Sequence, residues 1–306
     1  MKLALIHLVR RANGPAPLQR FLDSYAGHRP GIDHELVLAL KGFDGPADAA
    51  ESVAAARRRG LDPGYVLLPD DGLDLTAYAR VVATVPADRY CFTNSYSRVL
   101  ADDWLAHLDR ALQDPTVHVA GATGSWASHQ DYRRYHLHLS SGYDTVFAGR
   151  EPTRQGFLAL TRRHLPDKRD HGRVAFKLAA AADMVRDRGA FASFPSAHLR
   201  TNAFAARREL LTALELPRIR GKRDAYRWES GRSGFTRRVL ESGGRVVVVA
   251  RDGSLYDPGA WPRSLTFWSG EQENLLVADN QTEEYQAAGP PGRELLSALA
   301  WGERPT

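Results

Sequence analysis

Sulfur-containing residues are scarce in this sequence: its 306 residues include one cysteine and two methionines. A single cysteine excludes an internal disulfide framework. Cys91 lies in the apolar run Tyr90-Cys91-Phe92, which favours a buried small side chain over a catalytic thiol. Long apolar runs are lacking too, and none approaches the roughly 18–20 residues that a membrane-spanning helix needs.

The first residues, MKLALIHLVRRANGP, do not have the pattern of a signal peptide. They contain no small-residue cleavage site, and their charges follow the apolar run instead of preceding it. We therefore interpret residues 3–9 as the first strand of the core. We expect a cytoplasmic protein whose contact with a membrane is at most peripheral.

Positive charge is concentrated in one part of the chain. The formal net charge is +5, but residues 200–238, called here the basic segment, hold eleven Arg or Lys residues against four acidic ones. Such a segment can attract phosphate groups, acidic glycans or anionic lipid, and it is equally consistent with a solvated face. It lacks interleaved aromatic residues and a recognisable module, so we expect no binding of nucleic acid.

Apolar strands and amphipathic helices alternate along the first 125 residues. The expected strands are 3–9, 34–40, 65–69, 89–93 and one that starts at 117, and the expected helices are 17–25, 47–59, 75–85 and 103–112, the last capped by Asp102 or Asp103. Further helices are expected at 174–188, 205–214 and 233–242, followed by a strand at 245–250. This alternation predicts an α/β fold with a mostly parallel sheet flanked by helices.

The residues that follow the expected strands are polar. They are 10–13, 41–44, 70–74, 94–97 and 123–126. In parallel sheets, ligands bind beyond the carboxyl ends of the strands. A binding site is therefore expected at that edge of the sheet.

Three segments carry a resemblance to a known family. Asp71-Gly72-Leu73-Asp74 precedes the strand at 89–93, Asp103-Trp104-Leu105 opens the helix after it, and LRTNAFAARREL covers 199–210. With this order of elements the chain resembles the GT-A fold of nucleotide-sugar glycosyltransferases, especially inverting family-2-type and rhamnan-synthesis relatives. The resemblance implies a single domain over 1–306, with a nucleotide-binding part at 1–125 and an acceptor-side part with a C-terminal extension at 126–306.

The family's metal-binding Asp-x-Asp is missing. Ser95 and Ser97 stand where its two aspartates belong. Mg²⁺ or Mn²⁺ bound to a diphosphate prefers anionic oxygens, and neutral hydroxyls do not replace that charge. We assign no metal ligand, which leaves Mg²⁺ or Mn²⁺ open as a cofactor and favours a metal-independent reaction. His129, His136 and His138 have no carboxylate or cysteine at ligand spacing, so no zinc site is expected.

The resemblance implies residues for both substrates. Arginines can neutralise a leaving diphosphate because the guanidinium fork matches phosphate geometry. On the donor side we place Arg10, Asp44, Asp71, Asp74, Asn94, Ser95, Ser97, Lys222 and Arg223, and on the acceptor side Trp126, Thr201, Asn202 and Trp228.

An inverting transferase also needs a carboxylate base. In the family this base precedes a helix that ends in glycine before the next strand, and WESGRSGFTRRVLESGGRVVVVA has that outline. The resemblance thus implies Glu229 as the base and Asp224 as the second candidate, while a structural role for Glu229 stays open.

The implied function is transfer of a hexosyl group from a nucleotide-sugar to a glycan or other hydroxyl acceptor in polysaccharide biosynthesis. The alternative is an inactive GT-A-like protein that binds glycans or serves in assembly.

Overall fold

The fold is taken from a computed structural model that describes residues 1–129, 189–214, 219 and 221–302. His136, His138 and the helix expected at 174–188 lie outside these ranges. Within them, no helix has the length and apolar character to cross a bilayer.

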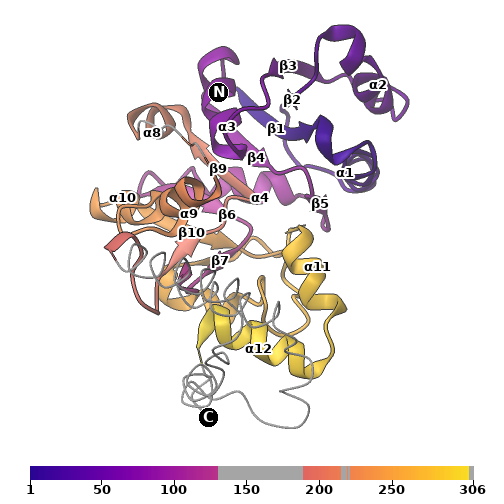
Figure 1. Ribbon diagram of the computed structural model, residues 1–306. Helices are drawn as coiled ribbons and strands as arrows, with labels where there is room; N and C mark the ends of the chain where they lie inside the picture. Colours follow the sequence, from indigo (N-terminus) through magenta and orange to yellow (C-terminus); the bar gives the residue numbers. More distant parts are fainter. Residues whose placement is uncertain (130–188, 215–218, 220, 303–306) are drawn as a thin grey trace, which may run out of the picture.

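A mixed sheet forms the centre of the protein (Figure 1). Among the described residues it has eight strands, in the order β11-β10-β6-β9-β4-β1-β2-β3. Their bounds are β1 Leu3–Arg10, β2 Glu35–Lys41, β3 Gly64–Leu68, β4 Arg89–Thr93, β6 Val117–Gly121, β9 Ala203–Arg207, β10 Arg245–Val249 and β11 Leu255–Tyr256. Only β9 and β11 run antiparallel to their neighbours, so the predicted α/β fold with a mostly parallel sheet is confirmed.

Two short ribbons and a series of helices surround this sheet. The ribbons pair β5 (Arg98–Val99) with β12 (Val277–Ala278) and β7 (Gly124–Ser125) with β8 (His198–Leu199). The α-helices are α1 Ala16–Gly27, α2 Pro46–Arg57, α3 Asp74–Thr84, α4 Trp104–Ala111, α8 Arg208–Ala213, α9 Lys222–Ser230, α10 Phe235–Glu241, α11 Asn280–Ala287 and α12 Pro290–Trp301, and the 3₁₀ helices are η1 Arg11–Asn13 and η3 Pro258–Ser264.

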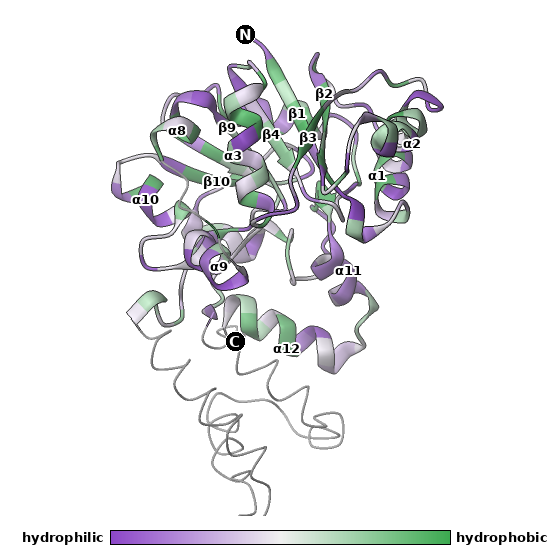
Figure 2. Ribbon diagram, turned by 45° about the horizontal axis from the view of Figure 1, so that its top comes forward, coloured by the Kyte–Doolittle hydropathy of each residue, from purple (hydrophilic) through white to green (hydrophobic). Residues whose placement is uncertain are grey.

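The sheet is buried on both faces, which explains why its strands are apolar throughout. Alternate residues of β1 point to opposite sides: Leu3 and Leu5 pack with α1, α2 and α4, whereas Ala4 and Ile6 pack with α3, α9 and α10. Figure 2 shows the hydrophobic central strands between helices that are mixed in character. The hydrophobic cores on the two faces of the sheet therefore fix the positions of the carboxyl ends of the strands.

Two local predictions were wrong. Residues 205–207 of the helix expected at 205–214 belong to the strand β9, and only Arg208–Ala213 is helical. Ala203 to Ala206 are buried between β4 and β6, where hydrogen bonds to both neighbouring strands outweigh the high helix propensity of alanine. Asp103 occupies the position before α4, but it is left-handed at φ 58° and its side chain makes no capping bond.

His7 is a buried titratable side chain in the middle of β1. Its ring stacks on Phe21 of α1 with centroids 3.5 Å apart, and Nδ1 lies 3.1 Å from Thr93 Oγ1. Complete burial lowers the pKa of His7 to about 3, because the interior disfavours the charged ring. His7 is therefore neutral in the folded protein at physiological pH.

Acid should destabilise the fold through His7. The unfolded chain binds this proton near pH 6.5 and the folded chain only near pH 3, so unfolding is favoured as the pH falls between these values. The contribution is at most about 1.4 kcal/mol per pH unit. Urea unfolding between pH 7 and pH 5 should show a shallower loss of stability for His7→Asn than for the wild type. Parallel loss in the two proteins would contradict this account.

Candidate functional site

The residues 200–202 lie at the carboxyl ends of β4 and β6. The pairs Thr93–Ala203 and Gly121–Phe204 are in register across β9. The ladder continues beyond the strands, because Asn94 N donates to Asn202 O (2.9 Å) and Arg200 N donates to Thr123 O (3.1 Å). The turn expected at 94–97 and the segment at 199–202 are therefore brought together at the predicted edge.

A cavity of about 100 Å³ opens at this edge. Its wall combines polar and aromatic side chains from the sheet edge, α9 and the C-terminal part. The lining residues are Ser125, Ala127, Ser128, His129, His198, Arg200, Tyr226, Glu229, Ser230, Phe267, Trp268 and Gln281.

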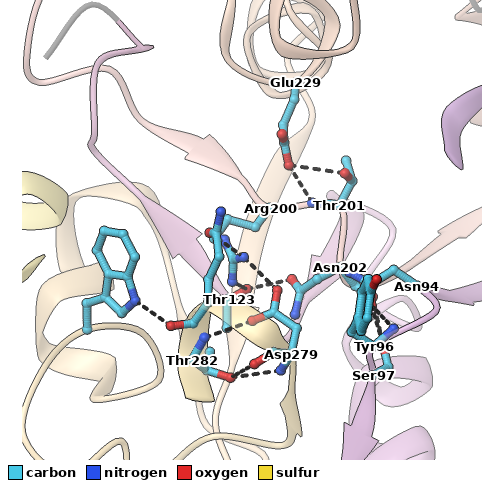
Figure 3. Close-up of polar contacts among 12 residues, drawn as sticks. Asn94, Tyr96, Ser97, Thr123, Arg200, Thr201, Asn202, Glu229, Asp279 and Thr282 are labelled. Carbon is cyan, nitrogen blue, oxygen red and sulfur yellow. Dashed lines mark hydrogen bonds and ion pairs between the residues drawn. The ribbon is translucent and has the colours of Figure 1, made fainter. Parts of the chain in front are cut away.

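Glu229 is held at the wall of the cavity by Thr201. Its Oε1 accepts hydrogen bonds from Thr201 N (2.8 Å) and Thr201 Oγ1 (3.1 Å) (Figure 3). No described residue bonds Oε2. The preceding residue on α9, Trp228, is buried and stacks on Phe235 with centroids 4.5 Å apart. One oxygen of Glu229 is thus anchored, and the other has no hydrogen-bond partner in the described part of the chain.

Arg200 links the sheet edge to the C-terminal part of the chain. Its Nη2 donates to Asp279 Oδ2 (2.6 Å) and Gln281 Oε1 (2.7 Å), and its guanidinium lies 4.2 Å from the centre of the Phe267 ring. Its Nη1 donates to Thr123 Oγ1 (3.3 Å), which in turn donates to Asn202 Oδ1 (2.7 Å). Because Asp279 is buried beside it, the charge of Arg200 is already balanced and the side chain acts as a structural link.

Asp279 also begins α11. Its Oδ1 accepts from Thr282 N (3.0 Å), and Asp279 N donates to Thr282 Oγ1 (2.7 Å), which is a reciprocal capping box. One carboxylate therefore fixes both the start of the helix and the guanidinium of Arg200 (Figure 3).

Residues of the turn at 94–97 form hydrogen bonds with one another. Asn94 Oδ1 accepts from Tyr96 N (2.9 Å) and Ser97 Oγ (3.1 Å), and Ser97 Oγ also lies 3.1 Å from Asn202 O. Ser97 and Ser95 are buried, and Tyr96 is exposed. These neutral, mutually bonded groups do not fit a divalent cation, which prefers several anionic oxygens. In the described part of the chain, no cluster of three His, Cys, Asp or Glu residues could hold a metal ion.

Charged groups gather at the ends of β1, β2 and β3. Arg10 forms a two-pronged ion pair with Asp70, with both contacts at 2.9 Å. The buried Lys41 donates to Gly72 O (2.7 Å) and lies 3.9 Å from Asp70. The hydrogen bond from Arg10 and the positive charges of Arg10 and Lys41 lower the pKa of Asp70, so this carboxyl stays ionised.

Asp74 at the start of α3 faces the same region as Glu229. Burial raises the pKa of Asp74, and the charge of Glu229 raises it further, while Lys41 and Arg10 oppose the change. Two predicted residues, Asp74 and Glu229, are therefore close enough to influence each other, although they belong to different parts of the sequence.

Other predicted donor residues lie in ion pairs or on the surface. Asp44 pairs with Arg11 (2.9 Å), and Asp71 forms a two-pronged pair with Arg80. Lys222 is exposed at the first residue of α9, and Arg223, which has partners within the protein, follows it. Their roles in donor binding stay predictions.

Three further candidates do not line the cavity. Asp224 lies in the first turn of α9, whereas Glu229 lies near its end. Trp126 donates through Nε1 to Pro258 O (2.8 Å) and packs edge-on against Trp301. Trp228 belongs to the core behind α9.

Much of the basic segment serves internal contacts. Arg207 donates to Val117 O (2.9 Å), Arg208 to Tyr90 Oη (2.8 Å) and Arg238 to Leu214 O (2.8 Å). Together with Arg200, these residues stabilise the fold, so part of the charge seen in the sequence is not available to a ligand.

Sequence reasoning missed His198, Tyr226, Phe267 and Gln281 as wall residues. His198 stands in the two-residue strand β8, and Phe267 and Gln281 lie beyond the last strand of the sheet. No local motif marks them, because they meet only through long-range packing. The sequence did offer one signal for His198, because this residue directly precedes the segment 199–210 that carries the family resemblance.

No protein-family model matches the chain, and no curated protein sequence does. Solved structures do match. A mannosyltransferase from Pyrobaculum calidifontis, in complex with GDP-Man and Mn²⁺, is 14% identical with a TM-score of 0.44, over 97% of this chain and 69% of that one. A 4-diphosphocytidyl-2C-methyl-D-erythritol synthase from Anaerococcus prevotii is 9% identical with a TM-score of 0.41, over 81% and 88% of the two chains.

S. aureus TarS is 16% identical with a TM-score of 0.30, over 39% of this chain and 21% of TarS. This chain therefore spans about a fifth of the length of TarS. Nucleotide-sugars are present in two of the similar structures, GDP-Man in the mannosyltransferase and UDP-GlcNAc in a complex of TarS residues 1–349.

Asp279→Asn should separate the two tasks of Asp279. The amide oxygen can still cap α11, but Arg200 is left buried without its counter-charge. We expect the free energy of unfolding, measured in urea, to fall by about 3–5 kcal/mol. The matched control is Asp257→Asn, which removes an exposed pair with Arg245 and should cost less than about 1 kcal/mol. Equal losses of unfolding free energy in the two variants would show that the buried pair stabilises the fold no more than the exposed pair does.

Proposed function

We propose that this chain is a glycosyltransferase that moves a hexosyl group from a nucleotide-sugar to a hydroxyl group of a glycan or related acceptor. The observation that carries the proposal is Glu229, a carboxylate at the wall of the cavity with one oxygen anchored by Thr201 and the other without a hydrogen bond to any described residue. The cavity lies beyond the carboxyl ends of β4 and β6, where sheets of this kind bind ligands.

The wall of the cavity suits one edge of a sugar ring. A water molecule takes about 30 Å³ in the liquid, so the cavity of about 100 Å³ holds a group of about three waters. Neighbouring hydroxyls of a sugar would enter it, while the rest of the ring would lie at its mouth. Phe267 and Trp268 are buried and stacked on each other, so they would form an apolar floor beneath the sugar, and the amide nitrogen of Gln281 would offer a donor to its hydroxyls.

Glu229 would act as the general base. It takes the proton of the acceptor hydroxyl while the hydroxyl oxygen forms a bond to the anomeric carbon of the donor. The bond from that carbon to the diphosphate breaks, and the nucleoside diphosphate leaves with the electron pair. The amide and hydroxyl of Thr201 hold the carboxylate in the orientation that this transfer needs.

The donor would lie along the strand ends between Arg10 and the turn at 94–97. Ser95 and Asn94 would donate hydrogen bonds to the diphosphate, and Asp74 would contact the nucleoside. The positive charges of Lys222, Arg223 and Arg10 would balance the negative charge of the diphosphate. The residues at the turn do not fit a metal ion, and no step of this proposal passes through one.

Glu229→Gln tests the base. The amide oxygen can still accept from Thr201, so the fold and donor binding should stay unchanged, but the amide cannot take a proton. We expect the transfer or hydrolysis rate of a nucleotide-sugar to fall by about 10²–10⁴-fold. Donor affinity is measured by calorimetry with UDP-, GDP- and dTDP-sugars, each with and without Mn²⁺.

The matched control is Glu209→Gln, which changes an exposed residue of α8 and should leave the rate unchanged. Absence of binding to every donor would sink the proposal. Binding without turnover in the wild type would instead favour a glycan-binding or assembly protein.

A further inference from the structure

His198 stands in the cavity wall with one ring nitrogen fixed. Its Nδ1 lies 2.8 Å from Ser196 O. A carbonyl oxygen can only accept, so Nδ1 carries the proton and donates it. In the neutral ring this leaves Nε2 as a lone-pair acceptor.

Nε2 is available to a ligand. It has no hydrogen-bond partner among the described residues, and His198 and Glu229 line the same cavity. The two side chains come from adjoining elements, since β8 packs on α9. Nε2 of His198 and Oε2 of Glu229 are thus acceptor atoms of the cavity wall that have no hydrogen-bond partner among the described residues.

The surroundings keep the ring neutral. Burial lowers the pKa of His198, and the charge of Arg200 acts in the same direction, whereas Glu229 and the bond to Ser196 oppose the change. Burial also raises the pKa of Tyr226, which therefore remains a neutral phenol in the wall. His129 is the remaining titratable group of the lining. At neutral pH, His198 accepts a hydrogen bond but does not donate one from Nε2.

Resting on the proposed function, we infer that His198 Nε2 binds a second hydroxyl of the acceptor, next to the one that Glu229 deprotonates. A cavity that takes one edge of a sugar ring and has these two acceptor atoms in its wall selects a substrate with neighbouring hydroxyl donors. The acceptor class is therefore a sugar with two adjacent free hydroxyls, and His198 is a specificity-determining residue.

Two substitutions separate ligand binding from a structural role. In His198→Asn the amide N–H can still donate to Ser196 O, but no atom replaces Nε2. In His198→Gln the amide oxygen can replace Nε2, but the bond to Ser196 O is lost. A structural role predicts damage in the Gln variant, and a binding role predicts damage in the Asn variant.

The probes are methyl hexopyranosides and their mono-deoxy derivatives, titrated into protein with ¹⁵N-labelled histidine. We expect the free protein to show protonated Nδ1 and unprotonated Nε2, and the Nε2 resonance to shift when a hexoside binds. His198→Asn should bind this hexoside about five-fold more weakly, as expected for one neutral hydrogen bond, and His198→Gln within about two-fold of the wild type. One deoxy derivative should bind the wild type as weakly as the intact hexoside binds His198→Asn.

The control is His28→Asn, since His28 also bonds a carbonyl through Nδ1 (Ser24 O, 2.9 Å) but lies after α1. Its hexoside affinity should match the wild type, and melting temperatures show that each variant is folded. An unmoved Nε2 resonance with every hexoside, or normal affinity in His198→Asn, would overturn the inference. Hexoside binding through Nε2 without any sugar transfer would overturn the proposed function alone.

Discussion

The buried ion pair between Arg200 and Asp279 is the contact on which the site depends. A guanidinium at the edge of β4 and β6 is tolerable in the interior only because this carboxylate lies 2.6 Å away. The pair joins the sheet edge to the start of α11, and through Thr123 it reaches Asn202. Thr201, between these two fixed residues, holds Glu229. The position of the candidate base therefore follows from a charge pair that touches no substrate.

The turn at 94–97 changes how a donor could be bound. A carboxylate turn would repel a diphosphate unless a cation were bound, whereas this turn is neutral and its side chains bond one another. Asn94 Oδ1 and the Ser97 hydroxyl keep the turn in shape, while the amide nitrogen of Asn94 makes no hydrogen bond to a described residue. Under the proposed function, Arg10, Lys222 and Arg223 would balance the charge of the diphosphate. A rigid neutral turn is thus compatible with diphosphate binding but not with the usual metal ligands.

The strands of the N-terminal half could be predicted because each is a mostly apolar run, and the expected strand at 89–93 has the observed bounds. β9 could not, because an alanine-rich segment has no intrinsic strand signal and gains its conformation from β4 and β6. Glu229 was found through its place before α10 and β10. Asp279 was not, because its partner Arg200 lies 79 residues away along the chain. His198 was not, because the residues that share the cavity with it come from distant parts of the sequence.

The central claim is that one site, at the carboxyl ends of β4 and β6, binds the donor and places its sugar beside Glu229. A crystal structure with a bound nucleotide-sugar tests this most directly. The account predicts the diphosphate beside Asn94 and Ser95, no cation held by that turn, and the anomeric carbon directed toward the cavity of Glu229. A nucleotide bound away from this edge, or a sugar directed away from Glu229, would contradict it.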